Sequence, residues 1–406
     1  MRTVIMVSPG YPAEMPFFVR GLAACGARVI GVGDQPVDAL PPMAREHLAA
    51  HWHVPSFADE DSVVAAVREH ARGVSVDQVE SLWEPTMLLA ARLREALGLP
   101  GMTVAQTLPF RDKEVMKQTI DAAGIRTPHH YRATSVAEVR DAVLRVGYPA
   151  IVKPIAGAGS ADTHRLDGAA DLERALPQLR GVPEVSVEEF IDGEEFTYDT
   201  ICAHGDILFE NISWYRPRPL IARSLEWVSP ITLALRDHTV PYLASGLAMG
   251  RAVIGALGFE TGFTHMEWFR TSSGEAVFGE IGARPAGART VDVMNYACDT
   301  DLFTRWAEAV VAGRFTERVE HRFNAASVCK RAEGQGRITA IEGLGRLLSE
   351  VGEWVMAVDL LPLGAPRRDW RQTLLSDGWV MVRHPELSAC VEIADRFASE
   401  LRLYAG

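Results

Sequence analysis

Apolar runs of strand length alternate with segments of helical spacing along the first hundred residues. The strand-like runs are Thr3–Val7, Ala27–Val32 and Gln78–Trp83, and the helical segments are Met15–Cys25, Glu60–Ala71 and Thr86–Leu97. This alternation predicts a parallel sheet with helices on both faces, as in a doubly wound domain. No G-x-G-x-x-G turn follows the first run, so a dinucleotide site has little support. We expect loops at the carboxyl ends of these strands to form one wall of a substrate cleft.

Two further apolar runs late in the chain predict a β-hairpin. Phe263–Arg270 and Glu275–Ile281 flank the turn-rich segment Thr271–Gly274. Each arm carries one glutamate among Phe, Met, Val, Ile and Trp side chains. A carboxylate in such surroundings is costly to bury unless it is paired or holds a metal. The alternative, that both glutamates lie on a solvated sheet face, is also common in antiparallel sheets.

Strand alternation indicates which side chains meet at this hairpin. His265 and Glu267 share one face of the first arm, and Glu280 and Arg284 share one face of the second if the extended run continues. Two carboxylates and a guanidinium could then lie over one spot. The pattern therefore predicts a site, with the solvated face as its competitor.

Two lysines precede the hairpin at element boundaries. Asp112 can cap a helix whose first turn holds Lys113, and the strand-like Tyr148–Val152 delivers Lys153 to the glycine-rich segment Pro154–Ser160. Backbone N–H groups of such a loop can approach phosphate oxygens while the ammonium neutralises them. The segment is not a P-loop, and a flexible turn is the alternative interpretation.

The rest of the chain supplies strands and one candidate loop. Glu188, Glu189 and Glu195 lie in or beside a predicted strand over Val185–Ile191, either as edge charges or as ligands of a base and a ribose. Arg and Pro enrichment predicts an exposed loop at Trp214–Pro219. Further strands are expected at Thr197–Ala203, Ile207–Ser213, Ala325–Lys330, Trp354–Leu360 and Trp379–Arg383, and helices at Pro241–Leu257, Leu302–Ala312, Leu344–Glu350 and Leu387–Leu401.

Composition limits the classes of function. The chain has 406 residues and a net charge of -12, which predicts two or three domains and argues against a nucleic-acid surface. No segment has the length and apolarity of a signal peptide or a membrane span, so we expect a cytoplasmic protein without a membrane partner. The five cysteines are far apart and form no CxxC pair, which favours reduced thiols over disulfides or zinc.

Five short motifs occur in an order that resembles the ATP-grasp superfamily. They are DK at Asp112-Lys113, YPAIVKP with GAGS in Tyr148–Ser160, VEEFIDGEEF at Val187–Phe196, THME at Thr264–Glu267 and EIGARPAG at Glu280–Gly287. The resemblance, which runs from about Asp112 to Ala312, implies an α/β and α+β fold. We expect a Rossmann-like N-terminal domain at 1–105, a two-subdomain ATP-grasp core at 106–185 and 186–312, and a small α+β C-terminal domain at 313–406.

The resemblance also implies a role for each matching residue. It implies that Lys113 and Lys153 contact the ATP phosphates and that Gly157, Gly159 and Ser160 form a flap over them. It also implies that Glu188 binds the adenine, that Glu189 and Ile191 form the hinge beside the base, and that Glu195 binds the ribose. Glu267 and Glu280 match magnesium ligands, for which Mn²⁺ can substitute. Arg284 resembles the arginine that steadies the transferring phosphoryl group or the substrate carboxylate. Many members have Asn where this chain has Gly282, so whether one or two metal ions bind stays open.

We therefore expect an ATP-dependent carboxylate–amine ligase that forms an amide through an acyl phosphate and releases ADP and phosphate. Its partners would be small acids and amines, amino acids above all, and a homodimer is the commonest assembly for such a chain. His265 could orient a substrate or deprotonate the amine, or it could be a hydrogen-bonded core residue. Arg289, Arg216 and Arg218 are candidates for substrate carboxylates by charge alone. The alternatives are a bicarbonate-activating carboxylase and a non-catalytic ATP sensor.

Overall fold

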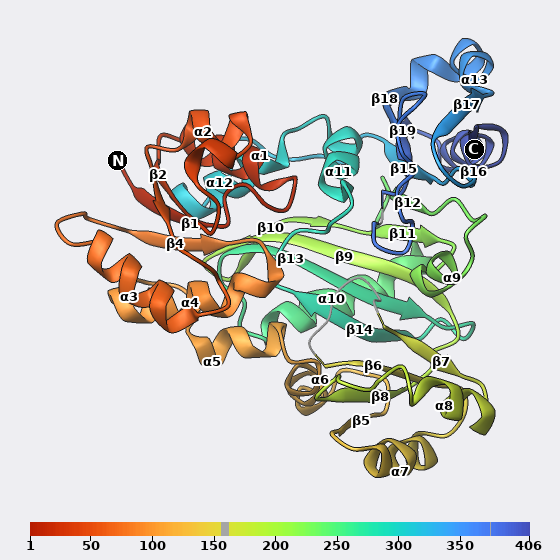
Figure 1. Cartoon of the computed structure of the whole chain (residues 1–406), viewed down its shortest axis with the longest axis horizontal. Coiled ribbons are helices and arrows are strands. Elements are labelled where there is room, and N and C mark those ends of the chain that lie inside the picture. Colours follow the sequence, from red (N-terminus) through yellow and green to blue (C-terminus); the bar gives the residue numbers. More distant parts are fainter. Residues whose placement is uncertain (156–161, 374) are drawn as a thin grey trace.

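The computed structural model describes residues 1–155, 162–373 and 375–406, and its described strands form four sheets (Figure 1). The predicted flap residues Gly157, Gly159 and Ser160 lie outside the described residues. Of the helices that are described, none has both the length and the apolar character needed to cross a bilayer.

The N-terminal domain is a parallel four-stranded sheet, as predicted. Its order is β3 (Ala50–His53), β2 (Arg28–Gly33), β1 (Thr3–Val7) and β4 (Gln78–Ser81), with helices α1 (Met15–Ala24), α2 (Pro42–His47), α3 (Glu60–His70) and α4 (Met87–Leu97). Side chains of β1 alternate between two cores. Val4 and Met6 pack in the core that contains α1, whereas Ile5 and Val7 pack in the core that contains α3 and α4. Glu14, after β1, and Glu84, after β4, form hydrogen bonds with Arg289 and Arg284 in the later part of the chain.

A second sheet has four antiparallel strands and lies below the large sheet in Figure 1. Its order is β5 (His130–Ala133), β8 (Val185–Glu189), β6 (Ala150–Pro154) and β7 (His164–Leu166), and it is preceded by α5 (Val104–Thr107) and α6 (Lys113–Ala122). Helices α7 (Val136–Val146) and α8 (Ala169–Ala175) supply the apolar side chains that cover one face. The other face carries the charged side chains of the site.

The largest sheet has nine antiparallel strands and spans the centre of the molecule (Figure 1). Its path is β14 (Ala276–Gly282), β13 (Gly262–Arg270), β9 (Glu194–Ala203), β11 (Ser213–Arg216), β12 (Ile231–Ala234), β15 (Asn324–Lys330), β19 (Gly378–His384) and β18 (Val355–Leu360), with β10 (Asp206–Asn211) beside β9. Its helices are α9 (Pro219–Ser224), α10 (Ala244–Ala256), α11 (Thr290–Cys298), α12 (Leu302–Ala312), α13 (Leu344–Val351) and α14 (Leu387–Glu400). A small sheet of β16 (Glu333–Gly334), β20 (Arg402–Ala405) and β17 (Ile338–Glu342) completes the C-terminal region.

Helix α10 packs unusually closely on the back of this sheet. A Cβ atom added at Gly246 would lie 2.1 Å from Cη2 of Trp268, and one at Gly250 would lie 2.4 Å from Cδ1 of Tyr198. The small residues of α10 therefore admit two large aromatic side chains of β13 and β9. Because these rings face α10, the neighbouring positions of the same strands face the cleft.

The prediction of an exposed loop at Trp214–Pro219 is wrong. Ser213–Arg216 is strand β11, and α9 begins at Pro219. The Trp214 ring stacks at 6.3 Å on Phe196, and Tyr215 reaches the cleft. The aromatic residues of this segment fill both faces of the sheet, and that packing outweighs its Arg and Pro content.

Candidate active site

A cleft opens between the second four-stranded sheet and the β13–β14 edge of the large sheet, with about 770 Å³ of empty space open to solvent. The predicted site residues on its walls are Lys113, Lys153, Glu188, Glu189, Ile191, Glu195, Glu267 and Glu280. They come from α6, β6, β8, β9 and both arms of the hairpin. Residues up to 170 positions apart in sequence therefore meet in one place.

Glu267 and Glu280 are direct cross-strand partners in the hairpin. Partners in an antiparallel pair project from the same face, so both carboxylates enter the cleft. Among the described residues, no group of three or more His, Cys, Asp or Glu side chains is placed to hold a metal ion. Two carboxylates nevertheless fit Mg²⁺, which keeps several waters and takes phosphate oxygens as further ligands. Gly282, opposite His265, adds no side-chain ligand.

Lysine ammonium groups surround Glu280. Its Oε2 lies 3.4 Å from Nζ of Lys113 and 3.7 Å from Nζ of Lys153. Burial alone would raise the pKa of Glu280, but Lys113, Lys153 and Lys117 together lower it to about 2. The carboxylate is therefore charged at neutral pH, and the lysines stand where an anionic ligand would meet them.

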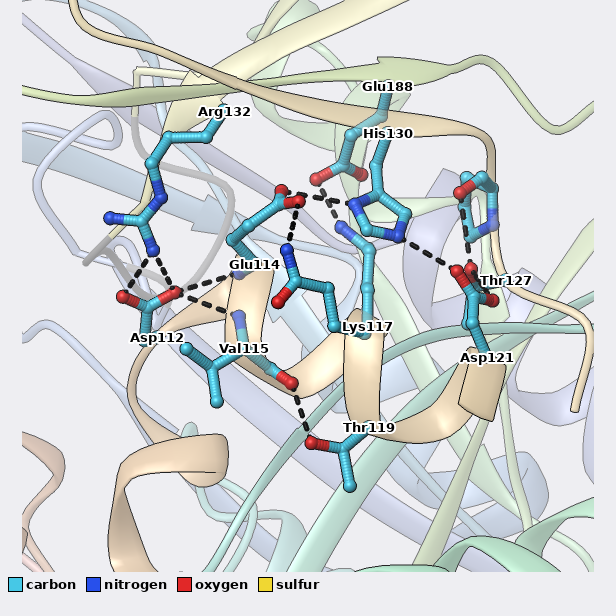
Figure 2. A network of polar contacts seen from close by, with 12 residues as sticks. Asp112, Glu114, Val115, Lys117, Thr119, Asp121, Thr127, His130, Arg132 and Glu188 are labelled. Carbon is cyan, nitrogen blue, oxygen red and sulfur yellow. Dashed lines mark hydrogen bonds and ion pairs between the residues drawn. The ribbon is translucent and has the colours of Figure 1, made fainter. Parts of the chain in front are cut away.

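Lys117 is a site residue that the sequence reasoning missed. It is fully buried one helical turn after Lys113, and its ammonium group pairs with Oε1 of Glu188 (Figure 2). The other Glu188 oxygen lies 3.1 Å from Nζ of Lys153. The i, i+4 spacing of the two lysines on one helix face was the available signal.

The predicted nucleotide-binding residues Glu189, Ile191 and Glu195 each contact an arginine. Glu189 accepts two hydrogen bonds from Nη2 of Arg126, at 3.0 and 2.9 Å. Nε of Arg218 donates to Oε2 of Glu195 at 3.2 Å, and its Nη1 donates to the carbonyl oxygen of Ile191 at 2.9 Å. Burial and the charge of Glu267 raise the pKa of Glu195 to about 8, although Arg218 opposes them.

His265 is buried beside Asp199, a second residue that the sequence reasoning missed. Its Nδ1 lies 2.6 Å from Oδ1 of Asp199, and its Nε2 lies 3.6 Å from Oε1 of Glu267. Burial lowers the pKa of His265, but Asp199 and Glu267 outweigh this effect and raise it to about 9. Tyr215 donates to Oε1 of Glu267 at 3.3 Å. A protonated imidazole fits an orienting role better than that of a base.

The predicted substrate arginines lie in three different surroundings. Nε of Arg284 lies 2.9 Å from Oε2 of Glu84, beside a small cavity shared with His265 and Glu280. Arg289 forms an ion pair at 3.0 Å with Asp292. Arg216 is not brought to the cleft. Its guanidinium makes two hydrogen bonds, at 2.9 and 3.1 Å, to Asp395 of α14, and Arg218 lines the cleft in its place.

Comparison with known proteins identifies the class. Residues 23–101 match the family model of the ATP-grasp N-terminal domain, and residues 110–213 match that of the ATP-grasp domain. An L-amino acid ligase from Bacillus licheniformis has the same fold, with a TM-score of 0.80 at 20% identity over 100% of this chain and 99% of its own. Residues 23–101 and 110–213 therefore carry an ATP-grasp N-terminal domain and an ATP-grasp domain, and the predicted fold class is confirmed.

Two proteins of known name are similar to this chain in sequence. An L-arginine-specific L-amino acid ligase of Bacillus subtilis is 32% identical over 218 residues, which span 52% of each chain. A formate-dependent phosphoribosylglycinamide formyltransferase of Synechocystis is 27% identical over 337 residues, with 80% of this chain and 81% of the relative covered. The chain therefore spans only about half of the length of the Bacillus subtilis ligase. The chain is thus similar in sequence both to an amino acid ligase and to a formyltransferase.

Proposed function

We propose that the protein is an ATP-dependent carboxylate–amine ligase that forms an amide bond, with amino acids as its substrates. The amino acid class is suggested by the name of the Bacillus subtilis relative. The observation that carries the proposal is the pair Glu267 and Glu280, opposed across the hairpin, with Lys113 and Lys153 within 4 Å of Glu280. This arrangement provides positioned charge of the kind that phosphoryl transfer requires.

The proposed reaction has two steps. An oxygen of the substrate carboxylate attacks the γ-phosphorus of ATP. The bond between this phosphorus and the oxygen that bridges to the β-phosphate breaks, ADP departs, and an acyl phosphate is formed. The amine nitrogen then attacks the acyl carbon, loses a proton and displaces inorganic phosphate, which leaves the amide. Magnesium, held by Glu267 and Glu280, would neutralise charge on the phosphate oxygens.

Residues of the chain itself take distinct parts in this scheme. Lys113 and Lys153 neutralise the transferring phosphoryl group, and Arg284 orients it or the substrate carboxylate. Protonated His265 donates a hydrogen bond to the substrate carboxylate and does not accept the proton of the substrate amine. Glu195, held by Arg218, lies where a ribose hydroxyl can bind.

A turnover assay tests the proposal. The protein is incubated with ATP and magnesium, with pools of amino acids, and with bicarbonate present or absent, while phosphate release and product mass are measured. Phosphate released only when both an acid and an amine are present, together with an amide product, supports the ligase. Strict dependence on bicarbonate would replace it with a carboxylase, and nucleotide binding without turnover would replace it with a sensor.

A further inference from the structure

Glu188 lies between two lysines at the floor of the nucleotide cleft. Its Oε1 pairs with Lys117 and its Oε2 lies 3.1 Å from Nζ of Lys153. Figure 2 shows the Lys117 side chain rising from α6 toward Glu188 on the adjoining strand. Lys117 is not among the residues that line the described cleft, whereas Lys153 and Glu188 are. The direct ion pair of Lys117 is therefore with Glu188 rather than with a ligand in the cleft.

Charge balance explains why this carboxylate needs both partners. Burial by itself disfavours the charged form of Glu188, but Lys117 and Lys153 hold its pKa well below the usual range. Lys153 has a second acidic neighbour, Glu280, at 3.7 Å. Without Lys117, the charge of Glu188 would be balanced by Lys153 alone. The Lys153 ammonium group would then be drawn to Glu188 and away from the cleft.

Helix α6 is well suited to hold Lys117 in place. Nη2 of Arg132 on β5 lies 2.6 Å from Oδ2 of Asp112, the N-cap of the helix. His130, also on β5, lies 3.0 Å from both Glu114 and Asp121 (Figure 2). The helix is thus fixed to the second four-stranded sheet at its start and along its length. Lys113 and Lys117 therefore keep a constant relation to Glu188 on the same sheet.

We infer that Lys117 and Glu188 form a positioning pair that sets the place of Lys153 at the ATP phosphates. The inference rests on the proposed nucleotide site and gives Glu188 a part other than recognition of the adenine amino group. Each of its carboxylate oxygens contacts a lysine, and through Lys153 Glu188 acts on the phosphate end of the nucleotide. The adenine is bound mainly by the segment that follows, Glu189 to Ile191.

Equilibrium binding of a non-hydrolysable ATP analogue with magnesium tests the role of Lys117, with no acid or amine present. We expect Lys117→Met to weaken binding roughly ten- to hundredfold, since a charge-assisted contact is lost. Lys117→Arg should recover most of the affinity. Lys330→Met is the matched control, because Lys330 is also buried and does not line the cleft, and its Nζ bonds to Ser229 and to backbone oxygens of α14. It should lower the Tm without changing the affinity.

The outcomes separate this inference from the proposed function. If the wild-type protein binds no analogue, both fall. If the wild-type protein binds and a folded Lys117→Met variant binds equally tightly, only the positioning role is overturned. If Lys117→Met and Lys330→Met weaken binding equally, the effect of Lys117 is one of general stability and the inference also fails.

A second measurement distinguishes the two roles of Glu188. Purine riboside triphosphate lacks the 6-amino group but is otherwise like ATP. If Glu188 acts through Lys153, Glu188→Gln weakens binding of ATP and of this analogue by the same factor. If Glu188 reads the amino group, the variant weakens ATP alone, and that result would overturn the inference.

Discussion

Glu84, just beyond the end of β4, accepts a hydrogen bond at 2.9 Å from Nε of Arg284, which follows β14. Arg111 forms a second ion pair with the same carboxylate. Both arginine–glutamate pairs are largely shielded from water. The N-terminal domain therefore holds a predicted catalytic arginine in place, although the two residues are 200 positions apart.

Replacing Glu84 should affect the chemical step more than nucleotide binding. Glu84→Gln keeps the shape of the side chain but removes the charge that orients Arg284. We expect kcat to fall about tenfold or more while KM for ATP changes little, because misplacing a positioned charge is costly in the transition state. Steady-state kinetics at varied ATP would check this. A normal kcat would show that Arg284 does not depend on Glu84.

Removal of either central charge should abolish turnover without unfolding the protein. Glu280→Gln removes a proposed magnesium ligand, and Lys153→Ala removes a proposed phosphate contact. We expect each to lower kcat by more than about a hundredfold, since positioned charge supplies most of the catalysis in phosphoryl transfer. Circular dichroism and the Tm would verify folding. A near-normal rate from either folded variant would rule out the proposed site.

Two arginines on one short segment give a matched comparison. Arg218→Ala removes the partner of Glu195 in the cleft, whereas Arg216→Ala removes the ion pair with Asp395 on α14 and a contact with the Trp214 ring. We expect Arg218→Ala to raise KM for ATP roughly tenfold, as loss of a charge-assisted contact predicts. Arg216→Ala should leave KM for ATP unchanged. Equal effects of the two changes would mean that Arg216 also acts at the cleft.

The ion pairs of His130 should make the stability of the protein depend on pH. Burial lowers the pKa of His130, but the hydrogen bonds to Glu114 and Asp121 outweigh this effect and that of Lys117, and they raise the pKa above the ordinary value. A raised pKa stabilises the fold fully below the unfolded value of about 6.5, and this contribution is lost as pH rises through the folded value. His130→Gln should therefore reduce the free energy of unfolding by roughly 1 to 3 kcal/mol at pH 5.5.

Urea denaturation of the wild-type protein and His130→Gln across pH 5.5 to 9 measures this contribution. The difference between the two should shrink as pH rises. A difference that is constant over this range would show that the histidine contributes through packing alone.

The sequence predicted those elements whose local pattern and tertiary role agree. Strands β1, β2 and β4 of the N-terminal sheet, helix α6 and the β13–β14 hairpin all follow from apolar periodicity and turn residues, whereas β3 was not predicted. Strand β11 did not, because its place in the sheet depends on β12 and Phe196 rather than on its own Arg and Pro residues. Short strands such as β7 and β16 likewise depend on partners that are distant in sequence.

The sequence predicted which charged side chains meet where a motif placed them on regular strands. Glu267 and Glu280 were paired from alternation alone, and the register agrees. Partners of these charges could not be predicted. Asp199 is the one acid of the predicted strand Thr197–Ala203, and nothing local indicates that it will meet His265. The partner of Arg216 lies 179 residues away on α14, so charge alone could not separate it from Arg218.

The large sheet runs without a break from the hairpin, through β12 and β15, into the C-terminal region. An expression fragment that stopped at residue 312 would expose the whole edge of β12 and strip the apolar side chains of α14 from the core. Such a fragment would invite strand-to-strand aggregation. Transplanting the catalytic core into another scaffold therefore requires carrying the last ninety or so residues with it.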